Sequence, residues 1–178
     1  MSSTKRPRVL RHRTIYDGRI FRVDRDDVRL TNGRRVNLEV VRHRGSVVLL
    51  PQPTPRSIVL IRQFRYAVNR WLWELPAGSL EPGESPAVCA RRECEEEIGL
   101  TPGRVTRLAA LFPTPGFCDE VMVFFLCRRL RQPTRAIERD LDEQIEPRVF
   151  SLAEAARLVD RGRIVDMKTV LGLRLVRN

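Results

Sequence analysis

The chain of 178 residues lacks the hallmarks of several protein classes. Its four cysteines include no C-x-x-C pair and show no zinc-like spacing, which argues against a structural zinc site. No apolar run approaches the roughly 20 residues that a membrane span needs. The basic segment 1–13 contains no apolar stretch of a secretory signal. We therefore expect a cytoplasmic protein with buried free thiols and no membrane partner.

Lysine is also scarce. It occurs only at Lys5 and Lys168, so the formal net charge of +11 comes almost entirely from arginine. A surface for nucleic acid, a field that attracts a small polyanion, and a compositional bias without function would each explain this excess. The arginines are scattered along the chain, and no RNA-binding aromatic motif accompanies them. The sequence therefore favours a small-molecule partner over nucleic acid.

A loop followed by a short helix is the most distinctive part of the sequence. Prolines and glycines between residues 76 and 83 exclude regular structure there. Ser85 is suited to cap a helix, and Pro86 is tolerated as its first residue. Gly99 favours the left-handed conformation that ends a helix. These signals predict a helix over about 86–98.

The end of this predicted helix is crowded with glutamates, against the negative end of the helix dipole. Glu93, Glu96 and Glu97 are three or four residues apart, so their like charges share one face and repel. Each conflict costs from a few tenths to about 1 kcal/mol. Either Arg91 and Arg92 balance a solvated acidic helix end, or the carboxylates await a hard divalent cation.

The spacing of the fixed residues resembles the Nudix box, G-x5-E-x7-R-E-U-x-E-E-x-G-U, where U is a bulky aliphatic residue. Every fixed position is matched, and Cys94 at the first U is the one loose fit. The fixed positions are Gly78, Glu84, Arg92, Glu93, Glu96, Glu97 and Gly99. The chain thus resembles the Nudix hydrolases, which favours the metal-site interpretation.

Flanking segments resemble the ADP-ribose pyrophosphatase branch of that family. They cover nearly all of the chain after residue 13, and related nucleoside-diphosphate-sugar hydrolases share them. The segments are 41–48, 62–65, 74–78, 113–120 and 166–169. The resemblance implies hydrolysis of ADP-ribose to AMP and ribose 5-phosphate. Hydrolysis of another nucleoside diphosphate sugar or dinucleotide, or binding of ADP-ribose or RNA without catalysis, are the alternatives.

The resemblance also implies roles for individual residues. Glu93, Glu96, Glu97 and the carbonyl of Ala77 would bind Mg²⁺, for which Mn²⁺ can substitute. Gly78 would let the backbone approach closely, while Arg92 would orient the glutamates and pair with Glu84. Glu96 would also contribute to catalysis.

Residues outside the box are expected to bind substrate and activate water. The general base is expected in the acidic loop 140–146, with Glu143 first and Asp142 second. Arg65 would grip the diphosphate, assisted by Arg42 or His43, and Glu120 would contact the substrate. Two positions where relatives stack adenine on aromatic rings are aliphatic here, Ile20 and Leu38, so Phe21 or Trp71 would have to replace them.

The order of expected elements fits an α/β/α sandwich with a mixed β-sheet, preceded by a small antiparallel β-sheet. We expect a basic tail over 1–13, a β-subdomain over 14–44 and a hydrolase domain over 45–178. The apolar alternation around the turn 31–33 predicts a hairpin in the subdomain. Polar residues predict a loop over 128–139. By resemblance, the front sheet contributes to a homodimer.

Overall fold

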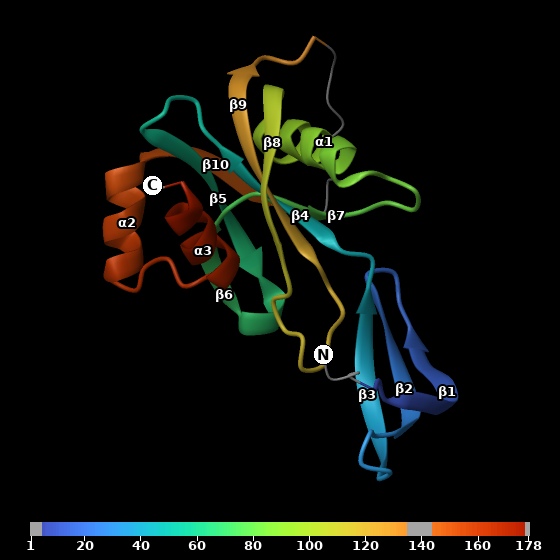
Figure 1. The fold of residues 1–178 in the computed structure, drawn as a ribbon. Helices are drawn as coiled ribbons and strands as arrows, with labels where there is room; N and C mark the ends of the chain where they lie inside the picture. Colours follow the sequence, from blue (N-terminus) through green and yellow to red (C-terminus); the bar gives the residue numbers. More distant parts are fainter. Residues whose placement is uncertain (1–4, 135–143, 177–178) are drawn as a thin grey trace. The chain divides into compact units, whose positions relative to one another are not determined.

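The computed structural model describes residues 5–134 and 144–176. It divides into two compact units. The front unit comprises Met1–Gly45 and Phe112–Val121, and the main unit comprises Ser46–Leu111 and Met122–Asn178. Figure 1 labels the helices and strands of both units.

An antiparallel sheet in the order β1-β2-β3 forms the front unit. Its strands are β1 (Arg8–Asp17), β2 (Phe21–Arg29) and β3 (Arg35–His43). The predicted hairpin turn is confirmed, because Gly33 has a φ of 85° and its N–H donates to the carbonyl of Leu30. The segment 112–121 joins this sheet through Val41, whose backbone bonds to Phe117 and Asp119.

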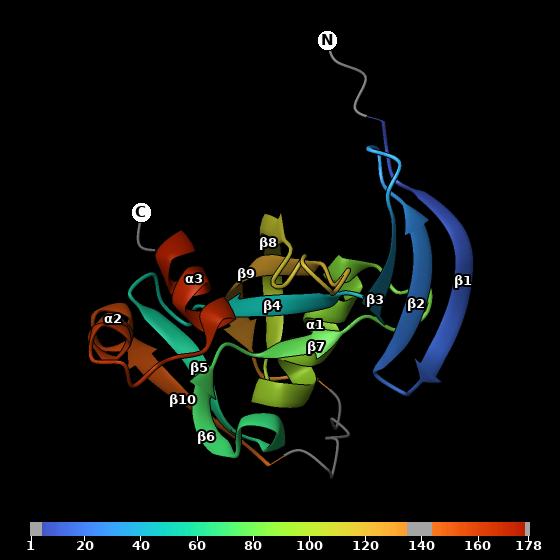
Figure 2. The ribbon, with the colours of Figure 1, turned by 90° about the horizontal axis from the view of Figure 1, so that it is seen from below.

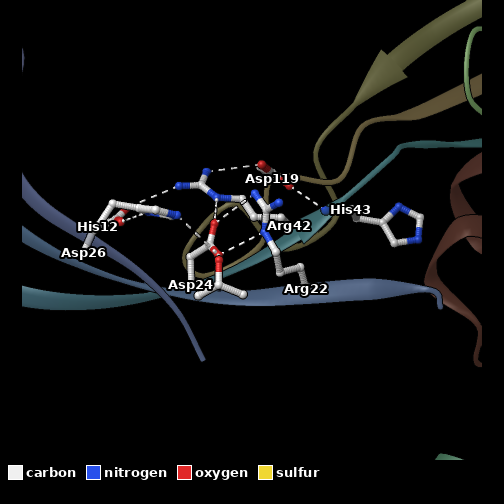
Figure 3. A network of polar contacts seen from close by, with 8 residues as sticks. His12, Arg22, Asp24, Asp26, Arg42, His43 and Asp119 are labelled. Carbon is white, nitrogen blue, oxygen red and sulfur yellow. Dashed lines mark hydrogen bonds and ion pairs between the residues drawn. The ribbon is translucent and has the colours of Figure 1, made fainter. Parts of the chain in front are cut away.

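Two buried carboxylates lie on one face of this front sheet, at Asp24 and Asp26. Arg42 bridges them, with its Nε 3.1 Å from Asp24 Oδ2 and its Nη2 3.2 Å from Asp26 Oδ2. A third bond, of 3.2 Å, joins Arg42 to Asp119 (Figure 3). Burial alone would raise the pKa of Asp24, but the hydrogen bonds from Arg22 and Arg42 lower it below its ordinary value.

The main unit contains two sheets, in the orders β10-β5-β6 and β7-β4-β9-β8. The second is mixed, because β4 pairs with β9 in parallel and with β7 antiparallel. The strands of the main unit are β4 (Ser46–Pro51), β5 (Ser57–Arg65), β6 (Arg70–Glu74), β7 (Ala77–Ser79), β8 (Thr101–Leu111), β9 (Met122–Arg131) and β10 (Ile145–Ser151).

Helices cover the two sides of these sheets, as the predicted sandwich requires. The helix α1 (Pro86–Ile98) packs on β4, β7 and β8, while α2 (Leu152–Asp160) and α3 (Met167–Leu175) pack on each other and on β10 and β4. Figure 2 shows α1 on one side and α2 and α3 on the other. The α/β/α sandwich with a mixed sheet is confirmed. Among the described residues, no helix is long and apolar enough to cross a membrane.

The core of the main unit lies between the strands and the two C-terminal helices. β4 is buried along its whole length, which explains why its sequence is a continuous apolar run. The buried core residues are Val48, Leu50, Ile58, Leu60, Leu75, Phe124, Phe150, Ala155, Ile164 and Leu173. A wholly buried central strand fixes the position of the short strand β7, which pairs with it.

Two stretches expected to lack structure belong to strands. β1 begins at Arg8, inside the predicted tail, and all ten of its residues are exposed. An exposed strand has no apolar alternation, so the sequence pattern hides it. β9 extends to Arg131, where the sequence predicts a loop, because its polar end pairs with Thr101 of β8.

Candidate active site

The helix α1 has the bounds that its end signals predict. The hydroxyl of Ser85 accepts a hydrogen bond from the N–H of Val88, and Pro86 begins the helix. Gly99 ends it with a φ of 70°, and its N–H donates to carbonyls of the last turn. These caps fix the register of the helix, so the glutamates of its last two turns share one face.

Arg92 holds these glutamates together. Its Nη1 lies 2.7 Å from Glu93 Oε1 and 2.8 Å from Glu96 Oε2. Its Nε and Nη2 each lie 3.0 Å from one oxygen of Glu84, which makes a bidentate pair. The fifth contact joins Nη2 to the carbonyl of Ser79 at 3.2 Å. One planar guanidinium therefore ties the loop before the helix to two of its carboxylates.

The hydrogen bonds between Arg92 and Glu84 shift the pKa values of both side chains. The hydrogen bond to Glu84 is the largest contribution that raises the pKa of Arg92, and burial opposes it. The same bond lowers the pKa of Glu84 below its ordinary value. Glu84 and Arg92 therefore both stay ionised, with Arg92 as the internal cation of the cluster.

Glu93 and Glu97 are buried and lie against the backbone of β7. The N–H of Ala77 donates to Glu97 Oε2 at 2.9 Å. A Cβ atom at Gly78 would overlap the carboxylate of Glu93. The missing Cβ at Gly78 therefore makes room for the side chain of Glu93, and the predicted role of Gly78 in the site stays a prediction.

The donor set suits a hard divalent cation. Carboxylate oxygens and a backbone carbonyl are ligands that Mg²⁺ accepts, and the missing Cβ at Gly78 lets the carboxylate of Glu93 lie against the β7 backbone. Within residues 5–134 and 144–176, no three acidic, histidine or cysteine side chains already surround one point as a ligand set. In this arrangement Arg92 holds Glu93 and Glu96, while Glu97 accepts the Ala77 N–H.

A second charged cluster borders the β7 segment. The Nε and Nη2 of Arg65 lie 2.9 and 2.8 Å from the two oxygens of Glu74, which is 1% exposed. The buried Lys168, at the start of α3, forms an ion pair with Glu74 and lies 3.1 Å from Asp166. Burial raises the pKa of Glu74, but the bonds to Arg65 and Lys168 outweigh it and lower the pKa. Glu97 also contributes to the raised pKa of Arg65, so the two clusters interact.

A hydroxyl completes the link between α3 and the β7 segment. The Thr169 hydroxyl accepts a hydrogen bond from the N–H of Leu75 at 2.7 Å. It also donates to Asp166 Oδ2 at 2.6 Å. Leu75 lies two residues before Ala77, so α3 fixes the backbone that leads into β7.

The predicted site residues are divided between the two units. The box residues, Ala77 and Arg65 belong to the main unit. Arg42 and Glu120 belong to the front unit, where Arg42 binds three aspartates and Glu120 lies 3.7 Å from His43. Their substrate-binding roles stay predictions. Glu143 and Asp142 lie outside the described residues.

Sequence reasoning gave Glu74, Lys168 and Thr169 no role. Glu74 follows Trp73 in a mostly apolar stretch, and only its burial shows that it needs a cation. A usable signal was the scarcity of lysine, since Lys168 is one of two in the chain.

Comparison with known proteins identifies the family. The NUDIX domain family matches residues 41–169, which is well over half of the chain. The chain belongs to the Nudix family. It is a Nudix hydrolase, and the predicted family is confirmed. Members of this family act as pyrophosphohydrolases and typically use a divalent metal ion.

Individual Nudix relatives span nearly the whole chain. An ADP-ribose pyrophosphatase of Bacillus subtilis is 36% identical over 159 residues, which are 89% of this chain and 86% of that protein. A GDP-mannose pyrophosphatase of Salmonella typhimurium is 35% identical over 152 residues, with coverages of 77% and 79%. A crystal structure of an ADP compounds hydrolase matches with a TM-score of 0.85 and 25% identity, over 99% of this chain and 95% of that one.

We expect Gly78→Ala to reduce the rate of diphosphate hydrolysis by about 100-fold, because the added methyl group displaces the Glu93 carboxylate by about 1 Å. Circular dichroism should show a folded protein with a lowered melting temperature. Gly116→Ala is the matched control, since a Cβ there meets no atom within 4 Å. Equal rates for the two variants would contradict the steric role of Gly78.

We expect Lys168→Met to lower the free energy of unfolding by about 3 kcal/mol at pH 7, because it leaves the buried Glu74 carboxylate with one cation fewer. The depressed pKa of Glu74 stabilises the fold at pH values above the ordinary glutamate pKa. This stabilisation is lost as the pH falls through the depressed pKa. The difference between wild type and variant should therefore shrink in acid, as measured by urea unfolding.

Arg148→Gln provides the control for this measurement. Arg148 pairs with Glu154 at 3.3 Å on the surface, and its side chain is 59% exposed. Its loss should cost less than about 1 kcal/mol. A cost for Lys168→Met no larger than that of the control would show that the buried pair does not stabilise the protein.

Proposed function

We propose that this Nudix hydrolase cleaves the pyrophosphate bond of ADP-ribose in a magnesium-dependent reaction, giving AMP and ribose 5-phosphate. The observation that carries the proposal is the set of glutamates on α1, gathered by Arg92 and placed beside the β7 backbone. The relative in Bacillus subtilis that is named for this substrate supports the choice of ADP-ribose.

Glu93, Glu96, Glu97 and the carbonyl of Ala77 would hold the metal ion. A bound divalent cation neutralises charge on the diphosphate and lowers the pKa of a bound water. Both effects matter because two anionic phosphates repel an attacking nucleophile. The capped helix fixes the Cα atoms of Glu93 and Glu96, so these side chains would exchange Arg92 for the metal ion by rotating about their own bonds.

Arg65 is suited to bind the diphosphate itself. Glu74 uses its Nε and Nη2, which leaves N–H groups of the guanidinium for phosphate oxygens. The hydrogen bonds to Glu74 are the largest contribution that raises the pKa of Arg65, so the group stays charged. Because Glu74 and Lys168 fix its orientation, Arg65 loses little freedom when it binds substrate.

The water that attacks phosphorus needs a general base. We assign this role to Glu143, with Asp142 as the alternative, from the family resemblance of the loop 140–146. Arg42 and Glu120 would also contact the substrate. These assignments rest on resemblance, and single substitutions to Gln or Asn that leave turnover unchanged would refute them.

Another nucleoside diphosphate sugar is the second candidate substrate. The two positions expected to stack adenine carry aliphatic side chains, and both are exposed, Ile20 by 59% and Leu38 by 44%. The GDP-mannose pyrophosphatase among the relatives shows that a similar chain acts on a different base and sugar.

We also propose a homodimer that forms through the front sheet. Four aliphatic side chains of the front unit are at least 44% exposed, namely Val9, Ile15, Ile20 and Leu38. Such a concentration of apolar surface on a small sheet is typical of an interface. Sedimentation equilibrium should give twice the chain mass of 20.6 kDa, and the mass of one chain would exclude the dimer.

A substrate panel tests the activity. Purified protein with Mg²⁺ should release AMP from ADP-ribose faster than it cleaves GDP-mannose or a dinucleotide, and EDTA should abolish all turnover. Glu97→Gln should lose about 100-fold or more, because the amide cannot replace a carboxylate as a metal ligand.

Glu95→Gln is the neighbouring control, since Glu95 accepts a hydrogen bond from Thr101 and is not a fixed position of the box. It should keep full activity. If GDP-mannose were cleaved faster than ADP-ribose, the proposed substrate would be wrong but the proposed reaction would stand. Full activity of Glu97→Gln would remove the metal-site assignment.

A further inference from the structure

The front sheet has two faces of opposite charge. Successive side chains of a strand point to opposite faces, and residues paired across strands share a face. Asp24 and Asp26 therefore lie on one face of β2, while Arg25, Asp27 and Arg29 lie on the other. The register places further arginines beside this second face. We call the following set the arginine face: Arg8, Arg11, Arg13, Arg25, Arg29 and Arg35.

Several of these arginines stand directly opposite one another. Arg29 pairs with Arg8 on one side and with Arg35 on the other, and Arg25 pairs with Arg13. Like charges directly opposite on a sheet are destabilising, by roughly 0.2–1 kcal/mol for each pair. Three such pairs therefore lower the stability of this small sheet without contributing to its structure.

Little on this face compensates the repulsion. Arg25 forms an exposed ion pair with Glu39 at 3.0 Å, and Arg11 stands opposite Asp27. Among the described residues, the other members of the arginine face form no hydrogen bond or ion pair through their side chains. The aspartates of the opposite face are already engaged, since Asp24 and Asp26 bind Arg42 (Figure 3). Positive charge therefore accumulates on the exposed side of the sheet.

Two adjoining hollows lie on the arginine face. One, of about 200 Å³, is lined by Arg11, Arg13, Arg25, Asp27 and Asn37. The other, of about 310 Å³, is lined by Leu10, Asp27, Arg35, Val36 and Asn37. Asp27 and Asn37 line both, so the hollows form one shallow depression. Its donors are guanidinium and amide groups, and no aromatic side chain lines it.

The dimensions of this face indicate a ligand with several phosphates. Arg25 and Arg29 are four residues apart on β2, which corresponds to roughly 13 Å. A single phosphate group cannot contact both ends of such a row, whereas successive phosphates of a polymer can. Guanidinium groups match phosphate oxygens with two parallel hydrogen bonds. The exposed rings of Tyr16 and Phe21 lie at one end of the same face, where they can stack bases without discriminating between them.

We propose that the arginine face binds the phosphate backbone of a nucleic acid, independently of base sequence. This function is additional to diphosphate hydrolysis and does not rest on it. The scatter of arginines along the sequence had favoured small-molecule partners. The pairing register gathers six of them on one surface, in a protein whose isoelectric point is about 10.9.

The binding of a fluorescent oligouridylate of about 20 nucleotides, followed by anisotropy at several salt concentrations, tests the proposal. For single strands the slope of log K against log salt is about −0.7 for each phosphate contacted. Wild-type protein should give a slope of about −4 if all six arginines take part. The triple variant Arg11→Gln, Arg13→Gln, Arg29→Gln should have a slope shallower by about 2 and an affinity lower by about tenfold or more at low salt.

A second triple variant, Arg157→Gln, Arg161→Gln, Arg163→Gln, removes the same charge from exposed positions of the main unit. It should keep the wild-type slope. Equal losses in the two variants would show an effect of net charge only and overturn the proposal. Unchanged RNA binding by the first variant would also overturn the proposal. So would a first variant that binds RNA normally but has a changed sedimentation mass, because the arginine face would then join two copies of the chain.

The hydrolysis assay separates this proposal from the enzymatic one. The first triple variant should cleave ADP-ribose at the wild-type rate, because none of its three positions belongs to the box or to the Arg65 cluster. RNA binding without hydrolysis by the wild-type protein would refute the enzymatic proposal only. Hydrolysis without RNA binding would refute the RNA-binding proposal only.

Discussion

Repulsion between carboxylates on one helix face is the constraint that governs the main unit. Glu93, Glu96 and Glu97 would push one another apart, and the negative end of the helix dipole adds to the cost. A single arginine inside the cluster offsets this cost, because its planar fork reaches Glu84, Glu93 and Glu96 at once. A lysine could not do so with one point charge. The loop that supplies Glu84 and the caps of α1 are arranged around that geometry.

Two clusters of like charge in this chain are resolved in different ways. The acids of α1 have an internal counter-ion, and they lie against a backbone that approaches at Gly78. The six arginines of the arginine face have few internal counter-ions among the described residues and face outward. The first arrangement is partly neutral, whereas the second leaves most of its charge available. Repulsion between like charges is therefore offset inside the protein where the cluster is buried, whereas an exposed cluster leaves its charge available to a ligand.

The bounds of α1 could be predicted from local signals. Contacts between residues far apart in the chain could not. Ser85, Pro86 and Gly99 act within a few residues of the helix ends, so the bounds of α1 follow from the sequence. The spacing of the glutamates likewise shows that they share a face. The pairing of Glu74 with Lys168 joins residues 94 positions apart, and no local pattern encodes it. The arginine face needs the strand register, including the irregularities of β1, before Arg8 and Arg13 can be placed.

The hydroxyl of Thr169 ties α3 to the backbone at Leu75, two residues before the strand that carries Ala77 and Gly78. Any fluctuation that detaches α3 must also release the Leu75 amide and the Glu74 carboxylate. The C-terminal helix and the segment that leads into β7 are therefore one cooperative unit in local unfolding. Their amide protons should therefore exchange with solvent together.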